Sequence, residues 1–170
     1  GSMKSLKVSD YEAISKLDGV RAASPMTNGS YVVIYQNKNW TTSVSGVSYN
    51  YLDVNNWSMK SGRFLSEKNV QNRERVAVVG KTVVKNLFGD EDPVGAEIRV
   101  KNIPFRIIGV LNSKGSGAMG NDQDDMVIIP YTTAMERVEG VDYLRMIYVT
   151  GKDENGIDRL QSDIENLLRV

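Results

Sequence analysis

Short runs of β-branched and aromatic residues, separated by turn residues, recur between residues 30 and 151 and constrain the fold of this chain most strongly. Two pairs of runs predict hairpins because only a few polar residues separate their members: SYVVIYQ with WTTSVSG, and EIRV with PFRIIGVL. Three further runs, RVAVV, MVIIP and YLRMIYVTG, have the length and composition of short strands. Few helical patterns lie between these runs, so the strands are not joined by regular crossover helices. The sequence therefore predicts an α+β fold.

Helical patterns stand near both ends of the chain. Residues 8–19 predict a short helix, with Ser9 and Glu12 at capping-box spacing and Gly19 as a left-handed stop. The chain closes on an amphipathic helix whose apolar stripe consists of Ile157, Leu160, Ile164, Leu167 and Leu168.

Two segments of the sequence match each other in pattern, Ala13–Val20 and Ala134–Val141. In each, the end of a helical pattern is followed by glycine and then by a valine that we expect to begin a strand. Any unit of helix, glycine and strand converges on this pattern, so the match has an ordinary explanation. The alternative is that two related half-units pack into one subdomain, with residues from about 45 to 125 inserted between them.

Composition narrows the chemistry that the chain can perform. It has 170 residues with no cysteine and no histidine, which excludes disulfides, thiolate catalysis and catalytic triads that depend on histidine. The formal net charge is zero and no basic run is present, so we expect no nucleic-acid partner. An enzyme on this chain would have to rely on carboxylates or on a hard metal ion. We therefore expect a non-catalytic domain without a cofactor.

Two segments resemble nucleotide-binding motifs. RVAVVGKT at residues 75–82 ends like a phosphate-binding loop, but the position five before Gly80 is Arg75, where that loop requires its first glycine. We expect Gly80 to make a tight turn from a strand into a helix. The segment Gly115–Gly120 spells the dinucleotide pattern of glycines, but it leads into a strand, whereas a helix should open there. We expect a flexible loop at that segment.

Two other groups of residues leave functional alternatives open. A divalent-metal hydrolase would use the carboxylates of Asp122, Asp124 and Asp125. A free-standing extracytoplasmic protein that binds a peptide or a lipid would use the aromatic segment 40–64 as a groove, although core or hairpin packing is the more common use of such residues.

Several ordered motifs cover most of the chain and resemble one family. They are Gly46-Val47-Ser48, Tyr51-Leu52, Gly62-Arg63-Phe64, Val76–Gly80, Leu87–Gly95, Phe105–Leu111, Asp124–Pro130 and Thr133-Ala134. In this order they resemble the extracytoplasmic core domain of MacB-type ABC transporter permeases, the FtsX-like class. The resemblance spans roughly residues 13–150.

The resemblance implies a fold and its boundaries. It implies a porter-like α+β subdomain formed by residues 4–44 and 126–170, with an inserted β-rich subdomain at residues 45–125. Residues 1–3, Gly1-Ser2-Met3, look like a cloning scar, so we expect the chain to be an excised piece. The resemblance implies that this piece comes from between the first and second transmembrane helices of a permease.

The resemblance also implies a function without covalent chemistry. Such a domain lies on the extracytoplasmic side of the cell membrane and couples ATP hydrolysis by a separate ATPase domain or subunit to export. Its expected partners are a periplasmic adaptor protein, a peptide or small-molecule substrate, and a second permease copy in the full-length transporter. We expect the contact surface at the loop around Ser116, Met119 and Asn121, because function commonly sits on such loops.

Overall fold

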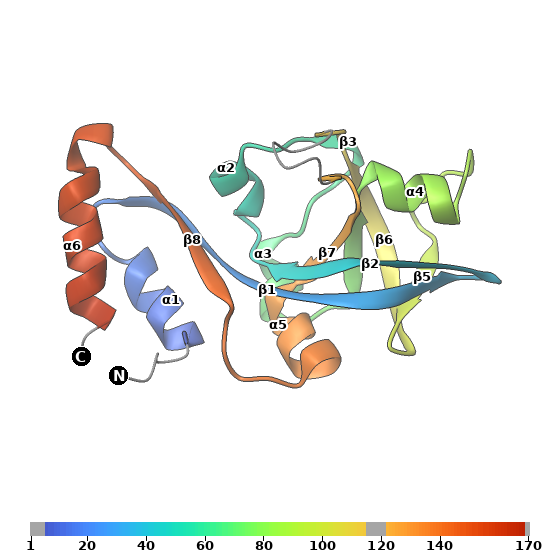
Figure 1. Ribbon diagram of the computed structural model, residues 1–170, viewed down its shortest axis with the longest axis horizontal. Helices are drawn as coiled ribbons and strands as arrows, with labels where there is room; N and C mark the ends of the chain where they lie inside the picture. The colour runs from blue at the N-terminus through green and yellow to red at the C-terminus, as the bar shows by residue number, and fades with distance from the viewer. Residues whose placement is uncertain (1–5, 115–121, 169–170) are drawn as a thin grey trace.

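The computed structural model describes residues 6–114 and 122–168, and it has a mixed α+β fold, as predicted (Figure 1). The helices are α1 (Val8–Ser15), α2 (Tyr51–Asn55), α3 (Glu67–Gln71), α4 (Lys81–Leu87), α5 (Tyr131–Thr133), the π-helix η1 (Ala134–Glu139), the 3-10 turn η2 (Glu154–Gly156) and α6 (Ile157–Leu168). The strands are β1 (Val20–Tyr35), β2 (Lys38–Val47), β3 (Met59–Gly62), β4 (Val76–Val79), β5 (Glu97–Val100), β6 (Ile103–Leu111), β7 (Met126–Pro130) and β8 (Met146–Gly151).

The sheet closes on itself into a ring of strands. Its neighbours run in the order β1, β2, β7, β4, β6, β5 and back to β1, while β3 pairs with β6 and β8 pairs with β1 outside the ring. Both predicted hairpins are present: β1 with β2, turning between Tyr35 and Lys38, and β5 with β6. Figure 1 shows α1 and α6 at one end of the molecule and the ring at the other, with the long strand β1 running through both.

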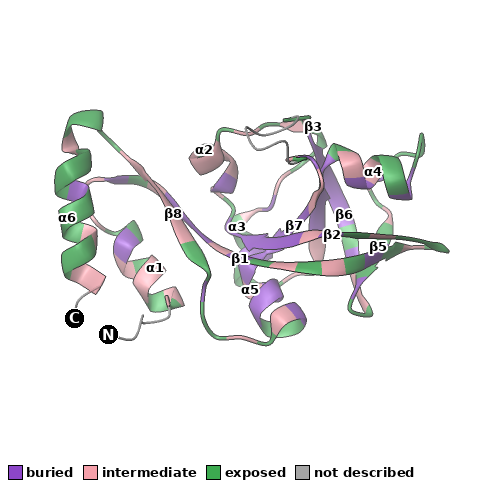
Figure 2. Ribbon diagram, in the orientation of Figure 1, coloured by how far each residue is buried: buried purple, intermediate pink, exposed green. Residues whose placement is uncertain are grey.

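The ring strands present apolar side chains on both faces, which explains their continuous apolar runs. In β4, Ala77 and Val79 belong to the cluster inside the ring, which α4 and η1 also join. Val78 belongs to a second cluster on the other face, under α2 and the segment that follows it. Figure 2 shows buried residues along β6 and β7.

A third apolar cluster holds α1 and α6 together, away from the ring. Ile14 of α1 and Leu160 of α6 are buried against Val20 and Ala23 at the start of β1. Leu160 confirms the predicted stripe of α6, whereas Ile157 at the start of that helix is 51% exposed.

The core clusters do not by themselves define two subdomains. Val33 and Val44, from residues 4–44, pack in one cluster with Ile98 and Phe105, from residues 45–125. The boundaries at residues 44/45 and 125/126 therefore stay a prediction.

The predicted ends of α1, and the predicted repeat of its C-terminal pattern at η1, were only partly confirmed. The backbone N–H of Lys7 donates to Asp10 Oδ2 at 2.8 Å, so the capping pair starts two residues earlier than the predicted Ser9 pair. Gly19 has no left-handed conformation and the helix already ends at Ser15. A side chain at Gly19 would instead meet Leu160, because its Cβ would lie 3.2 Å from Leu160 Cδ1. Gly140 is left-handed, with φ of 62°, but no strand starts at Val141. The two segments that match in sequence, Ala13–Val20 and Ala134–Val141, therefore differ in backbone structure.

Two buried tyrosines predict a loss of stability at high pH. Burial raises the pKa of Tyr51 to about 12, and Tyr148 nearby adds to the effect. Burial likewise raises the pKa of Tyr131 to about 12, with Tyr11 as the next cause. Above pH 10 the unfolded chain loses these protons and the folded chain does not, so we expect the free energy of unfolding to fall between about pH 10 and pH 12. Phenolate absorbance should show two of the eight tyrosines ionising last, and the Tyr51→Phe variant should remove one of them.

No helix in residues 6–114 and 122–168 is long and apolar enough to cross a bilayer.

Candidate functional site

The predicted contact residues Ser116, Met119 and Asn121 lie outside the described residues. The structure describes what holds this segment at either side, residues 112–114 and 122–125, which we call the loop base. The loop base lies where β6 ends and β7 begins, next to α2 and the start of α4 (Figure 1).

Asp124 joins the two sides of the loop base. Its carboxylate is buried, with the residue 5% exposed, and it accepts hydrogen bonds from Ser113 Oγ at 2.7 Å and from the backbone N–H of Lys114 at 2.6 Å. Its own backbone N–H donates to Asp122 Oδ1 at 2.8 Å. Hydrogen bonds to a carboxylate are stronger than those between neutral groups, so the backbone N–H and the hydroxyl group hold this side chain firmly in its buried position. Asp124 therefore fixes the distance between the two ends of the loop.

The neighbouring carboxylates tie the loop base to other elements. Asp125 Oδ1 accepts from Trp40 Nε1 at 2.8 Å and from Thr42 Oγ1 at 2.7 Å, both on β2. Asp122 Oδ2 accepts from Thr82 Oγ1 at 2.5 Å, on α4. The side of the loop base that precedes β7 is thus bonded to two elements that are distant in sequence.

The other side is held by α2 and the chain that follows it. Trp57 Nε1 donates to the backbone oxygen of Asn112 at 2.8 Å, and Asn112 Nδ2 donates to Ser58 Oγ at 2.7 Å. Lys114 Nζ lies 4.8 Å from the centre of the Trp57 ring and donates to the backbone oxygen of Asn55 at 3.2 Å. A cation placed over an indole ring in this way is attracted by the ring quadrupole. Both ends of the loop therefore start from rigid positions.

The carboxylates of the loop base do not form the metal centre that the hydrolase alternative requires. Asp122, Asp124 and Asp125 accept hydrogen bonds from hydroxyl, indole and backbone donors on different elements. Within the described part of the chain, no group of three or more acidic side chains could hold a metal ion. The three aspartates that suggested a hydrolase are explained by the hydrogen bonds that join the loop base to its neighbours.

In the segment that resembles a phosphate-binding loop, the backbone amides of Gly80 and Thr82 are already hydrogen-bonded within the domain. Gly80 follows β4 and precedes α4, as predicted, and its N–H donates to the Met126 oxygen at 3.0 Å. The N–H of Thr82 donates to the Asp124 oxygen at 3.2 Å. A Cβ on Gly80 would lie 2.2 Å from the same Asp124 oxygen. Glycine is therefore needed for close approach of the loop base, and these backbone donors do not cradle phosphate.

The aromatic side chains of residues 40–64 mostly pack against other residues of the domain, and lining a groove is not their main role. Tyr51 is 2% exposed and stacks with Phe64 at a ring separation of 6.5 Å, and both Trp40 and Trp57 donate their indole protons as described above. Tyr49, at 44% exposed, is the residue of this group that faces solvent. Packing, the more common use, is therefore what the structure shows for these residues.

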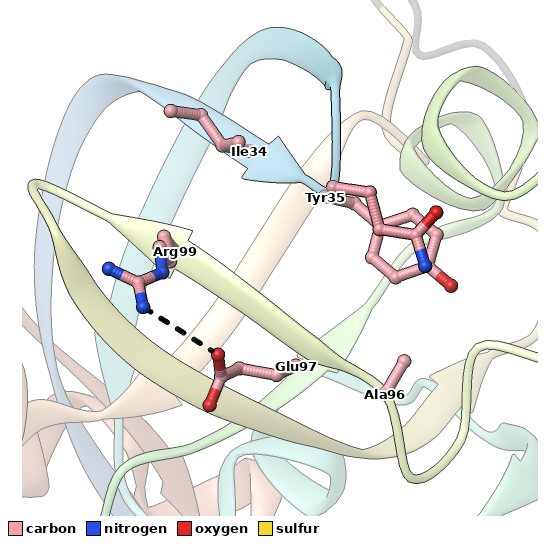
Figure 3. Close-up of a pocket in the computed structure, with 6 residues that line it drawn as sticks. Ile34, Tyr35, Ala96, Glu97 and Arg99 are labelled. Atoms are coloured by element: carbon pink, nitrogen blue, oxygen red, sulfur yellow. Dashed lines mark ion pairs between the residues drawn. The ribbon is translucent and has the colours of Figure 1, made fainter.

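A groove that the sequence did not indicate lies where β1 turns away from β5 (Figure 3). It has a volume of about 430 Å³, and its walls carry Ile34, Tyr35, Glu97 and Arg99. The Glu97–Arg99 pair is 4.0 Å apart and well exposed, so it contributes little stability. Tyr35 donates to Glu91 Oε2 at 3.0 Å, and this bond raises the pKa of the Tyr35 phenol.

Comparison with known proteins identifies the family. Residues 1–167 match the family described as the MacB-like periplasmic core domain. The chain is 40% identical over 172 residues to the macrolide export ATP-binding/permease protein MacB of Rhodospirillum rubrum, covering 100% of this chain and 26% of the relative. It is 36% identical over 169 residues to the protein of the same name from Chlorobium luteolum, covering 99% of this chain and 25% of the relative. The chain therefore spans about a quarter of the length of these curated relatives.

Solved structures share the fold. The periplasmic region of MacB from Actinobacillus actinomycetemcomitans superposes with a TM-score of 0.87 at 27% identity, covering 98% of this chain and 74% of that one. The extracellular domain of the ABC-type transporter YknZ from Gram-positive bacteria has a TM-score of 0.84 at 19% identity, covering 96% of this chain and 82% of that one. The order of the motifs, the ring of strands and these matches lead to one conclusion: the chain belongs to the MacB-like periplasmic core domain family.

Proposed function

We propose that this chain is the non-catalytic extracytoplasmic domain of an ABC transporter permease in the cell membrane. Its role is to couple ATP hydrolysis in the cytoplasm to the export or extracytoplasmic handling of a substrate. The observation that carries the proposal is the match over 98% of the chain to the periplasmic region of a MacB protein. The ATP would be hydrolysed by a separate domain or subunit, because the backbone amides of Gly80 and Thr82 are already hydrogen-bonded within this domain.

The packing of the two terminal helices supports a mechanical role. Ile14 of α1 and Leu160 of α6 are buried in one cluster, so the first and last helices form one unit (Figure 1). Two membrane helices attached to these ends would move that unit together. The long strand β1 continues from the unit into the ring, and it would carry the displacement to the far end of the domain.

We propose that the segment 115–121 contacts the partner, which is an adaptor protein or the exported small molecule or peptide. The loop base supports this role, because binding loops commonly stand on rigid scaffolds. The curated relatives are named for macrolide export, which favours a small-molecule substrate. In the full-length transporter we expect two permease copies to act together.

The natural reading frame on both sides of the chain tests the proposal. Apolar spans of about 20 residues on each side would be expected for a permease. A secretion signal upstream with a stop codon directly downstream would contradict it and would point to a free-standing binding protein.

Shortening the loop tests the contact surface. We expect replacement of residues 115–121 by a short glycine-serine linker to leave the melting temperature within about 2 °C, because the loop base keeps its own bonds. In the full-length protein, the same change should lower export or resistance at least about tenfold, the effect of losing roughly 1.4 kcal/mol of contact. A matched substitution of exposed residues in the turn at Asp90 serves as the control. Unchanged export with the shortened loop would show that the contact lies elsewhere.

A further inference from the structure

The joins that close the ring of strands differ in length, and the join between β1 and β5, which we call the seam, is short. β1 and β2 pair over ten residues, β2 and β7 over five, and β6 pairs with both β4 and β5 over four. The seam has two pairs, Val33 with Val100 and Ile34 with Arg99. Main-chain hydrogen bonds accumulate along a join, so a join of two pairs separates more easily than a longer one.

A second join of two pairs, between β4 and β7, is reinforced in ways that the seam is not. Directly beside that join, the N–H of Gly80 donates to the Met126 oxygen at 3.0 Å, and its four paired residues are fully buried. Within residues 6–114 and 122–168, no main-chain hydrogen bond beyond the ladder joins β1 to β5. On the outer side of the seam, Ile34 is 37% exposed. The seam is therefore the weakest join of the ring.

The seam ends at the groove of Figure 3, where β1 turns away and β5 extends further, to Glu97. The Ala96 oxygen accepts the N–H of Ile107 on β6. Main-chain groups alternate sides along a strand, so those of Glu97 and Arg99 point toward β1. Arg99 pairs there with Ile34, whereas Glu97 lines the groove. Water therefore reaches the main chain at one end of the seam.

Side-chain contacts hold the two sides of the seam to different parts of the ring. On the β5 side, Lys101 Nζ donates to a main-chain oxygen of η1 at 2.7 Å. On the other side, Trp40 of β2 donates to Asp125 at 2.8 Å, so β2 stays with β7. Across the seam, Tyr35 packs on the end of α4 and donates to Glu91 at 3.0 Å in an exposed position. A displacement of β1 therefore separates it from β5 before any other join gives way.

We propose that the ring opens at the seam, and that displacement of β1 from the end that holds the terminal helices opens it. β1 begins at Val20, beside α1 and α6, and reaches the seam at Val33, so one strand connects the two places (Figure 1). Opening exposes apolar side chains of the inner cluster to solvent, among them Ile98 and Val100. The opening is a property of the fold, whereas its use in export rests on the proposed function.

Hydrogen exchange measured residue by residue tests the opening. The amides of Ile34 and Arg99 face each other across the seam. The amide of Ser45 faces β7, because the N–H of the next residue, Gly46, donates to Thr27 on β1. After correction for intrinsic rates, we expect Ile34 and Arg99 to exchange at least about tenfold faster than Ser45. Equal protection of the three amides would overturn the proposal, since the seam would then open only with the whole ring.

Engineered disulfides test the seam against a matched control, and the chain has no cysteine of its own. I34C/R99C joins a residue pair across the seam, and V32C/T41C joins a pair between β1 and β2. Directly opposed residues of antiparallel strands have the Cα spacing that a disulfide requires. We expect oxidised I34C/R99C to slow exchange at positions 34 and 99 at least about tenfold relative to Ser45, and oxidised V32C/T41C to leave that ratio unchanged. The same slowing by both disulfides, or by neither, would contradict the proposal.

The same two disulfides in the full-length protein test the use of the opening in export. Oxidised I34C/R99C should lower export at least about tenfold and recover on reduction, whereas V32C/T41C should export equally well in both states. Full export by oxidised I34C/R99C would show that transport does not need the seam to open. Failure of the unmodified full-length protein to export would instead contradict the proposed function and leave the exchange result standing.

Discussion

The Asp124→Ala variant is expected to lose about 3 to 4 kcal/mol of unfolding free energy, the sum of two hydrogen bonds to a buried charged acceptor. Removing the carboxylate leaves Ser113 Oγ and the backbone N–H of Lys114 without this acceptor. The end of β6 and the start of β7 would then no longer be linked through the loop base. In a domain of this size the melting temperature should fall by about 6–16 °C, measured by calorimetry or circular dichroism.

The control for Asp124 is the Asp90→Ala variant, which removes the same charge from an exposed turn. We expect it to change the unfolding free energy by less than about 0.5 kcal/mol. Asp124→Asn should fall between the two, because an amide retains one acceptor oxygen. If Asp124→Ala and Asp90→Ala melt within about 2 °C of each other, the loop base does not hold the fold as the structure indicates.

The Gly80→Ala variant should be destabilised by about 3 kcal/mol, the upper part of the range for steric overpacking in a closed site. The added Cβ would lie 2.2 Å from the backbone oxygen of Asp124, which cannot move away like a flexible side chain. The bonds from Gly80 to Met126 and from Thr82 to Asp124 would lengthen with it. Urea unfolding should show a lower midpoint with an unchanged slope.

Gly156→Ala is the matched control, since a Cβ there meets its first neighbour, Asp153 Cβ, at 4.0 Å. That variant should be neutral or slightly stabilised, because alanine lowers the entropy of the unfolded chain. A Gly80→Ala variant as stable as Gly156→Ala would mean that the turn between β4 and α4 does not need glycine. The resemblance of GKT to a nucleotide motif would then need a different explanation.

Element types followed from the sequence where the pattern was long and regular. Both hairpins, the strands of RVAVV and MVIIP, and the apolar stripe of α6 from Leu160 onward were correctly predicted, because alternating or continuous burial leaves a direct trace in residue order. Helix ends were less predictable. The cap at Lys7 and Asp10 and the early end of α1 at Ser15 depend on side-chain geometry that several nearby residues could equally supply.

The candidate site was predicted only in part. The sequence indicated Asp122, Asp124, Asp125 and the segment beside them as candidates. It could not distinguish carboxylates that bind a metal ion from carboxylates that accept structural hydrogen bonds. That distinction depends on donors far away in the chain, such as Trp40 on β2 and Thr82 on α4. The groove at Tyr35 and Arg99 left no local signal, since it arises from the way β1 turns away from β5.

The sequence by itself determined the α+β class, the absence of thiol and imidazole chemistry, and the family, because these depend on composition and on the order of local motifs. Only the tertiary structure decided that β1, β2, β7, β4, β6 and β5 close into a ring, that β8 pairs with β1 outside this ring, and that Gly80 allows the backbone of Asp124 to approach closely. The physical reason is that pairing and close approach are properties of segments separated by tens of residues. Residue order specifies which side chains are available, and packing decides which of them meet.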